Sequence, residues 1–268
     1  MVHIRYLGEV QCILISQAFS LASPLMTICG SGSAMKLLFF LLVLSLFTLL
    51  APIYSDSSAK TLSGDQVFVI ENTSSFVDES DLMHVYGEVR NISNMSMTNV
   101  TINGSFYDNS GRHLNDYQRS CELPTINAGG ICPFEIMYID TKTTDRVEDF
   151  KLTAQGIVSD TIKPTKLRFH SENSRLDILG FYYINGRVSN EGSITATDSS
   201  VVATLYDKDG KVIAIGRALA EPVNILPDSL ANFGIAVAEK SQVHKTRGYS
   251  LMAFSTQYLS PPLLVDTK

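Results

Sequence analysis

Hydrophobic and polar residues alternate along most of the chain after residue 60, and this period of two predicts β-strands. In residues 99–107, Val100, Ile102 and Phe106 share one face of the predicted strand, and the polar residues between them share the other. The further strands predicted in this part of the chain are residues 67–71, 82–90, 113–121, 133–139 and 150–157. Short strands at this spacing, separated by turns rich in Gly, Asn and Asp, are typical of an antiparallel β-sandwich.

The pattern returns 99 positions later without a gap, so the chain contains a tandem repeat. Matched residues include Gly87, Asn91, Tyr107, Asp108 and Gly111 in the first copy and Gly186, Asn190, Tyr206, Asp207 and Gly210 in the second. A repeat of this length has a core of its own, which predicts two β-sandwich domains, residues 61–158 and 165–258. We expect a short linker at residues 159–164, with the domains end to end, and a flexible tail at residues 259–268.

Hairpin turns are predicted at residues 109–111 and 208–210, where Gly111 and Gly210 supply the positive φ that closes the loop. A Tyr-Asp pair precedes each turn. One interpretation is a ligand surface that both copies share. The favoured interpretation is structural, with the tyrosine packed at the strand end and the aspartate accepting backbone hydrogen bonds in the turn.

Two short runs resemble the signature of FxLYD domains: Gly104-Ser105-Phe106-Tyr107-Asp108 and Ala203-Thr204-Leu205-Tyr206-Asp207, each followed by a turn glycine. The runs Gly186-Arg187-Val188-Ser189-Asn190 and Phe233-Gly234-Ile235 are similar to that family as well. The first copy departs from the signature because it lacks Leu before Tyr107. The resemblance implies two tandem immunoglobulin-like antiparallel β-sandwich domains of an exported bacterial or archaeal protein. It implies no catalytic residue and no ligand, since none is established for the family.

Residues 37–53 form the only long apolar run of the sequence, with Met35-Lys36 before it and small residues up to Ala59 after it. This order is typical of a secretory signal. We therefore interpret residues 1–34 as an upstream extension of the gene model and residues 35–59 as a signal peptide or an uncleaved signal-anchor helix. Both interpretations predict an extracellular or cell-surface location for the remainder of the chain.

The positions of the cysteines and of several asparagines also favour an exported protein. Cys12 and Cys29 lie before the predicted domains, which leaves Cys121 and Cys132 as a predicted disulfide in an exported protein. Sequons for N-glycosylation occur at Asn72, Asn91, Asn94, Asn99 and Asn103. Asn91 matches Asn190, which has no sequon, so we expect this asparagine to close the strand end through backbone contacts.

The net charge of −6 argues against nucleic acid as a partner and leaves the N-terminal segment, if uncleaved, as the predicted contact with a membrane. The sequence after the leader contains neither a His-Glu-x-x-His nor a Gly-x-Ser-x-Gly motif, and no phosphate-binding glycine loop. We therefore predict no enzyme activity and no cofactor.

His84, Met95 and Met97 are weak candidates for a metal site, because imidazole and thioether ligands suit copper. Ile194 and Ala196 replace the two methionines in the second copy, which favours a packing role. We thus predict a non-catalytic cell-envelope protein that binds another envelope protein or a glycan in adhesion, assembly or scaffolding. The alternative is an accessory subunit that binds copper or a small ligand on the outer side of the membrane.

Overall fold

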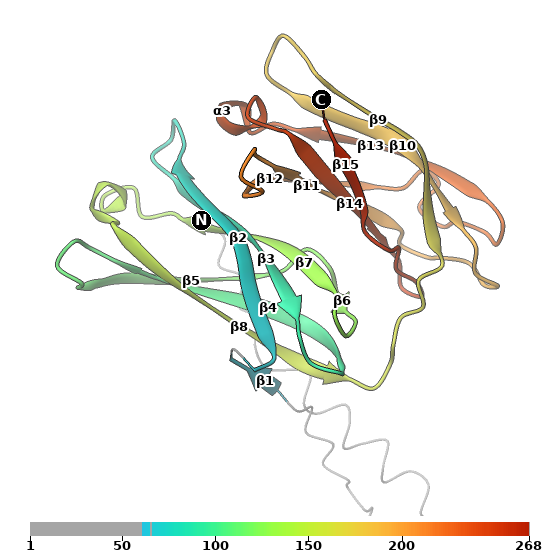
Figure 1. Cartoon of the computed structure of the whole chain (residues 1–268), viewed down its shortest axis with the longest axis horizontal. Coiled ribbons are helices and arrows are strands. Elements are labelled where there is room, and N and C mark those ends of the chain that lie inside the picture. The colour runs from blue at the N-terminus through green and yellow to red at the C-terminus, as the bar shows by residue number, and fades with distance from the viewer. Residues whose placement is uncertain (1–60, 65, 268) are drawn as a thin grey trace, which may run out of the picture. The chain divides into compact units, whose positions relative to one another are not determined.

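The computed structural model describes residues 61–64 and 66–267, which form an all-β structure of antiparallel sheets arranged in sandwich-like domains (Figure 1). The predicted upstream extension at residues 1–34, the leader at residues 35–59, Cys12 and Cys29 lie outside the described residues. Within the described ranges, no helix has the length and apolar character needed to cross a membrane.

The first domain contains β1 (Thr61–Ser63), β2 (Phe68–Val77), β3 (Met83–Asn91), β4 (Ser96–Tyr107), β5 (His113–Ser120), β6 (Thr125–Ile126), β7 (Ile131–Tyr138), the 3-10 turn η1 (Thr144–Arg146) and β8 (Asp149–Ser159). One sheet has the order β1-β8-β4-β5, with β6 paired to β4, and the other has the order β2-β3-β7. The apolar positions predicted in the third strand, Val100, Ile102 and Phe106, are all buried in the core between these sheets.

The second domain contains β9 (Leu167–Leu176), β10 (Tyr182–Asn190), β11 (Ser200–Tyr206), β12 (Val212–Leu219), β13 (Leu230–Val237), α3 (Lys240–Val243), β14 (Gly248–Phe254) and β15 (Leu263–Asp266). Its sheets have the orders β12-β11-β14-β15 and β13-β10-β9. The central order β5-β4-β8 of the first domain therefore returns as β12-β11-β14, as the sequence repeat predicts.

Both copies contain a glycine that is paired across the sheet with a phenylalanine, and the packing of the ring requires the glycine. Gly87 pairs with Phe134 across β3 and β7, and Gly186 pairs with Phe233 across β10 and β13. A Cβ atom at either glycine would lie 2.7 Å from the Cζ atom of the paired ring. The ring occupies the place of the missing side chain, so the two positions are matched together in both copies.

The C-terminal segment differs from the flexible tail that we expected. Residues Leu263–Asp266 form β15, which pairs with β14 at the edge of the sheet. Leu263 and Val265 pack against the core of the second domain, and this apolar contact outweighs the effect of the preceding Pro261-Pro262. In the first domain the same sheet edge is occupied by β1, which pairs with β8.

The two domains also contact each other through sheet faces, which differs from the end-to-end arrangement that we expected. Val202, Met252 and Phe254 of the second domain belong to the hydrophobic cluster that contains the core of the first domain. The second domain retains a separate core of its own. This interdomain interface comprises β2, β3 and β7 on one side and β11, β12 and β14 on the other.

Candidate functional site

A buried carboxylate lies at the centre of the interdomain interface. Glu88 on β3 has only 4% of its surface exposed. The Tyr206 hydroxyl donates a hydrogen bond to Glu88 Oε1 at 2.6 Å, and Asn72 Nδ2 donates to Glu88 Oε2 at 2.8 Å. Burial, together with the charge of Glu88, raises the pKa of Tyr206, so its hydroxyl keeps its proton and acts as a donor.

A second polar cluster surrounds His84, which lies on the same face of β3 as Glu88, with Tyr86 between them. His84 Nδ1 lies 2.7 Å from Glu135 Oε1, and Nε2 lies 3.4 Å from Asp78 Oδ2. The Tyr86 hydroxyl donates to the same Glu135 oxygen at 3.0 Å. The His84 ring stacks on Phe76, with 4.9 Å between ring centroids.

The carboxylates of this cluster favour the protonated form of His84. Burial alone would lower the pKa of His84, but hydrogen bonds to Glu135 and Asp78 outweigh burial and raise it. Glu239 of the second domain faces the same histidine; burial raises the pKa of Glu239, and the charge of His84 opposes that rise. Protonated His84 is thus an ion-pair partner for Glu135 and Asp78 of the first domain, one at each ring nitrogen, and the charge of Glu239 adds to the rise in its pKa.

The structure does not bring the three weak metal candidates together. Met97 is fully buried in the core of the first domain, and Met95 packs against that core. His84 lies on the opposite face of the β2-β3-β7 sheet, among the carboxylates described above. Among the described residues, no group of three or more His, Cys, Asp or Glu side chains has a metal-binding arrangement.

In the two shared Tyr-Asp pairs, the aspartates have the same role in both domains, whereas the tyrosines do not. Asp108 Oδ1 accepts hydrogen bonds from the backbone N–H groups of Ser110 and Arg112, both at 3.0 Å. Asp207 Oδ1 accepts from Asp209 and Lys211, both at 2.9 Å. Gly111 and Gly210 have φ angles of 77° and 73°. The aspartates and glycines therefore have the structural role that the sequence predicts.

The tyrosines diverge. Tyr107 is half-buried on the outer face of β4, where its ring meets His113 edge-on at 5.6 Å between centroids and Lys151 Nζ lies 5.2 Å from its centroid. Tyr206 points into the interdomain interface and binds Glu88. Sequence reasoning missed this contact. The available signal was the nearly continuous apolar run Val201-Val202-Ala203-Thr204-Leu205, which is typical of a strand buried on both faces.

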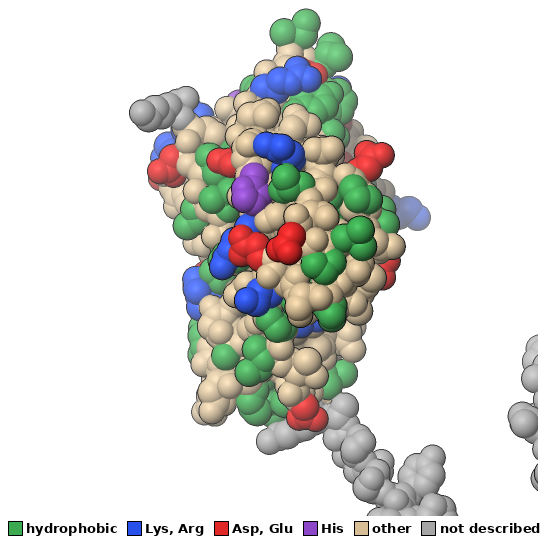
Figure 2. All heavy atoms as spheres, turned by 90° about the vertical axis from the view of Figure 1, so that its right-hand side faces the viewer, with side chains coloured by type: hydrophobic (Ala, Val, Ile, Leu, Met, Phe, Trp, Pro, Cys, Tyr) green, Lys and Arg blue, Asp and Glu red, His purple; other side chains and the backbone are tan. Residues whose placement is uncertain are grey.

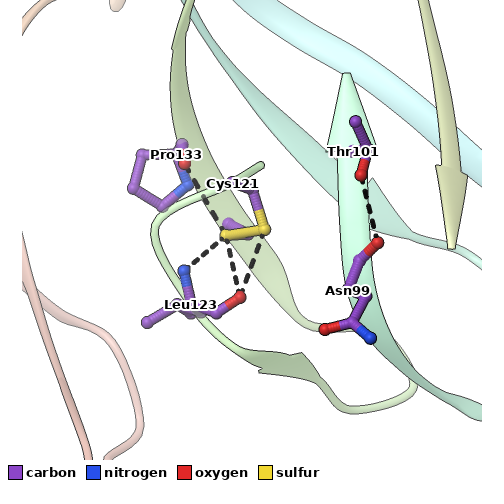
Figure 3. Close-up of a disulfide and its surroundings, with 6 residues drawn as sticks. Asn99, Thr101, Cys121, Leu123 and Pro133 are labelled. Atoms are coloured by element: carbon purple, nitrogen blue, oxygen red, sulfur yellow. Dashed lines mark hydrogen bonds between the residues drawn. A yellow bond between two sulfur atoms is a disulfide. The ribbon is translucent and has the colours of Figure 1, made fainter. Parts of the chain in front are cut away.

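The predicted disulfide between Cys121 and Cys132 is confirmed (Figure 3). The two Cα atoms are 5.9 Å apart, and 11 positions separate the cysteines in the sequence. The bridge is buried, and the Leu123 N–H donates to Cys132 Sγ at 3.0 Å. Ala220 and Ala231, the matching residues of the second domain, are buried in its core instead.

The sequon asparagines occupy different environments. Asn91 is fully buried, and its amide donates to the backbone oxygens of Met95, Ile126 and Asn127. This is the strand-closing role predicted for it, and Asn190 repeats the contacts with Ile194 and Ile225. A glycan on Asn91 is incompatible with this buried amide.

The other sequons are more accessible. Asn94 and Asn99 are exposed, and Asn103 is half-buried on the outer face of β4. The hydroxyl of Thr101, the third residue of the Asn99 sequon, donates to the Asn99 backbone oxygen at 3.2 Å (Figure 3). Asn72 is exposed, but its side-chain amide binds Glu88. Asn94 and Asn99 are therefore the sites best placed to carry glycans.

Comparisons with known proteins give a coarse result. No protein-family model matches the chain, and no curated protein matches it. Among solved structures, the chain is similar to an exo-chitosanase of Amycolatopsis orientalis, with 10% identity and a TM-score of 0.26 over 74% of this chain and 26% of that one. It is also similar to a β-glucuronidase of Bacteroides uniformis, with 12% identity and a TM-score of 0.28 over 78% and 32% of the two chains.

A transglutaminase of red sea bream is similar with 7% identity and a TM-score of 0.24, over 75% of this chain and 32% of that one. The chain thus spans about a quarter to a third of the length of these proteins. The similarity is to their β-sandwich domains. It says nothing about activity.

Proposed function

We propose that this chain is an exported, non-catalytic cell-envelope protein whose two immunoglobulin-like domains, similar to FxLYD domains, act as one binding or structural module. Its role is adhesion, assembly or scaffolding, with another envelope protein or a glycan as partner. The signal or anchor segment at residues 35–59 directs the chain outward.

The proposal rests on one observation: the buried titratable side chains bind other side chains and backbone groups of this chain. Glu88 binds Tyr206 across the interdomain interface, His84 is held by Glu135 and Asp78 within the first domain, and Asp108 closes a turn. General acid–base chemistry needs a proton donor or acceptor within reach of a substrate. Groups held by other side chains and by the backbone are suited to fixing two domains against each other.

Two further features support export. The Cys121–Cys132 disulfide is typical of proteins in an oxidising compartment. The exposed Asn94 and Asn99 lie in competent sequons on the surface of the first domain.

Labelling of intact cells tests the proposal. Cells that express the full chain are treated with a membrane-impermeant amine reagent, and the chain is then isolated and its intact mass measured. We expect labelled lysines, an oxidised Cys121–Cys132 pair and added glycan mass that disappears on Asn94→Gln with Asn99→Gln. Recovery of only unlabelled, reduced chain, while surface proteins of the same cells are labelled, would overturn export.

Metal analysis separates the proposed role from the copper-binding alternative. The isolated chain should carry no stoichiometric copper after dialysis against a weak chelator. Copper bound at one equivalent and lost on Met95→Leu with Met97→Leu would favour the alternative.

A further inference from the structure

The hairpin between β9 and β10 ends in an exposed apolar tip, formed by Leu176, Ile178 and Leu179. Ile178 is 101% exposed, Leu179 65% and Leu176 47%. Single exposed hydrophobic residues are common on protein surfaces and need no explanation. Three exposed apolar side chains on one hairpin tip form a concentrated apolar surface that does not contribute to packing of the core.

The turn itself does not require Ile178 and Leu179, because the first domain builds the same turn with polar residues at these positions; Leu176 matches Val77, which is itself 51% exposed. Asp177 Oδ1 accepts from the backbone N–H groups of Leu179 and Phe181, both at 2.9 Å. In the hairpin between β2 and β3, Asp78 Oδ1 accepts from Ser80 and Leu82 at the same 2.9 Å. The tip of that hairpin consists of the polar residues Glu79, Ser80 and Asp81.

Basic and aromatic side chains surround the base of the apolar tip. The Arg175 guanidinium lies 4.6 Å from the Tyr183 ring centroid, and Lys240 Nζ lies 4.7 Å from that of Phe181. The one carboxylate of the turn, on Asp177, accepts the two backbone hydrogen bonds. Figure 2 shows hydrophobic side chains at the upper end of the molecule, where the β9–β10 hairpin lies in Figure 1, with basic side chains beside them.

We propose that this tip inserts into the surface of a bilayer that contains anionic phospholipid. Ile178 and Leu179 enter the boundary between headgroups and acyl chains, while Phe181 and Tyr183 lie at headgroup level. Arg175 and Lys240 meet the lipid phosphates from the same depth. The order of apolar apex, aromatic ring and cation follows the polarity profile of a membrane interface, which favours lipid over a protein pocket.

The inference goes beyond the proposed function, because it adds a second contact with lipid to the one expected from the N-terminal segment. It does not depend on adhesion, assembly or scaffolding. Binding to vesicles can succeed or fail whatever partner the domains have on the cell.

The chain contains no tryptophan, so a single introduced tryptophan reports on its own surroundings. We would introduce Leu179→Trp into the full chain and add vesicles of phosphatidylglycerol and phosphatidylcholine. The expected result is a blue-shifted emission that brominated acyl chains quench. The matched control is Ser80→Trp, at the equivalent place in the acidic tip of the first domain, which should stay in water.

Two further variants in the Leu179→Trp background test the parts of the tip. Ile178→Glu, which installs the residue of the first domain, should raise the lipid concentration needed for the shift by at least about tenfold. Arg175→Gln with Lys240→Gln should raise that concentration roughly tenfold on anionic vesicles and leave it unchanged on vesicles of phosphatidylcholine alone.

Three results would overturn the proposal. One is an emission of Leu179→Trp that anionic vesicles do not move. Another is an equal shift for Ser80→Trp, which would show that the whole molecule, rather than this tip, enters the bilayer. The third is a shift seen only with native envelope membranes and lost after protease treatment of those membranes, which would assign the tip to a protein partner.

Discussion

Strands β4 and β11 occupy the same place in their respective domains, yet they are buried in different ways. Along β4, buried and half-buried residues alternate after Asn99, so one face meets the core and the other meets solvent. Along β11, every residue before Tyr206 is buried. The reverse holds for β3 and β10: β3 is buried along almost its whole length, and β10 alternates.

The difference shows how a duplicated domain acquires an interface. Each copy kept the inward face of its strands, including the Gly–Phe pair and the buried asparagine. The outward faces diverged. On β11 Val202 stands where β4 has Asn103, and Tyr206, which both copies share as a tyrosine, binds Glu88 of β3. At the matching position of β10, Arg187 stands in place of Glu88.

Exchange of outward-facing residues between the two copies should change the free energy of unfolding more than any other substitution considered below. Val202 on β11 is fully buried in the interdomain interface, and its counterpart Asn103 on β4 is half-buried. Val202→Asn should lower the free energy of unfolding by about 3–4 kcal/mol, because an apolar contact is lost and an amide is buried without a partner. Chemical denaturation measures this change.

The reverse exchange, Asn103→Val, is the control, made in a host that adds no glycan. It should change the free energy of unfolding by less than about 0.5 kcal/mol, as is usual for surface sites. Equal effects at the two positions would show that β4 and β11 are equivalent in solution and that the interface does not exist.

Removal of the disulfide should have the next largest effect. Cys121→Ala with Cys132→Ala gives the first domain the residues of the second, Ala220 and Ala231. The loss of a short loop constraint should lower the free energy of unfolding by about 3 kcal/mol. Reductant should destabilise the original chain by a similar amount and leave the variant unaffected; a variant as stable as the oxidised original chain would contradict this.

The two motif tyrosines provide a smaller and more specific test. Tyr206→Phe removes the donor to the buried Glu88 carboxylate and should cost about 2 kcal/mol of unfolding free energy, as expected for a hydrogen bond to a charged group. Tyr107→Phe, at the matching half-buried position outside the interdomain interface, should cost less than about 0.5 kcal/mol. If both variants have the same free energy of unfolding as the original chain, the Tyr206–Glu88 contact is absent in solution.

The smallest effect concerns pH. The pKa of His84 is raised in the folded chain, so protonated His84 stabilises the fold fully below its unfolded pKa of about 6.5. This stabilisation is lost as the pH rises through the raised folded pKa. The stability difference between the original chain and His84→Gln should therefore shrink as the pH rises above about 6.5.

Urea denaturation at a series of pH values measures that difference, with Tyr183→Gln at the matching position of the second domain as the control. A difference that stays constant or grows with rising pH would show that His84 is neutral in the folded chain.

Much of the fold could be predicted from local sequence. Alternation located the strand from residue 99 to 107, and the Asp-x-x-Gly pattern located the turns at Asp108 and Asp207, because strand pleating and turn closure depend on residues within a few positions. The disulfide followed from the count of cysteines in the predicted domains. The edge strands β1 and β15 were not predicted, because each is very short and is stabilised by the strand beside it rather than by its own residues.

The sequence by itself determined two similar β-rich units, their turns, the covalent bridge and the strand-closing asparagines, since each of these depends on short-range pattern or on a residue type. Only the tertiary structure decided that Tyr206 binds Glu88, a residue 118 positions away, while the Tyr107 ring contacts His113 and Lys151 of its own domain. The two tyrosines occupy the same local motif, and no local rule separates them. The outward face of a strand becomes an interior only when another sheet covers it, and that depends on the free energy of packing the two sheets together.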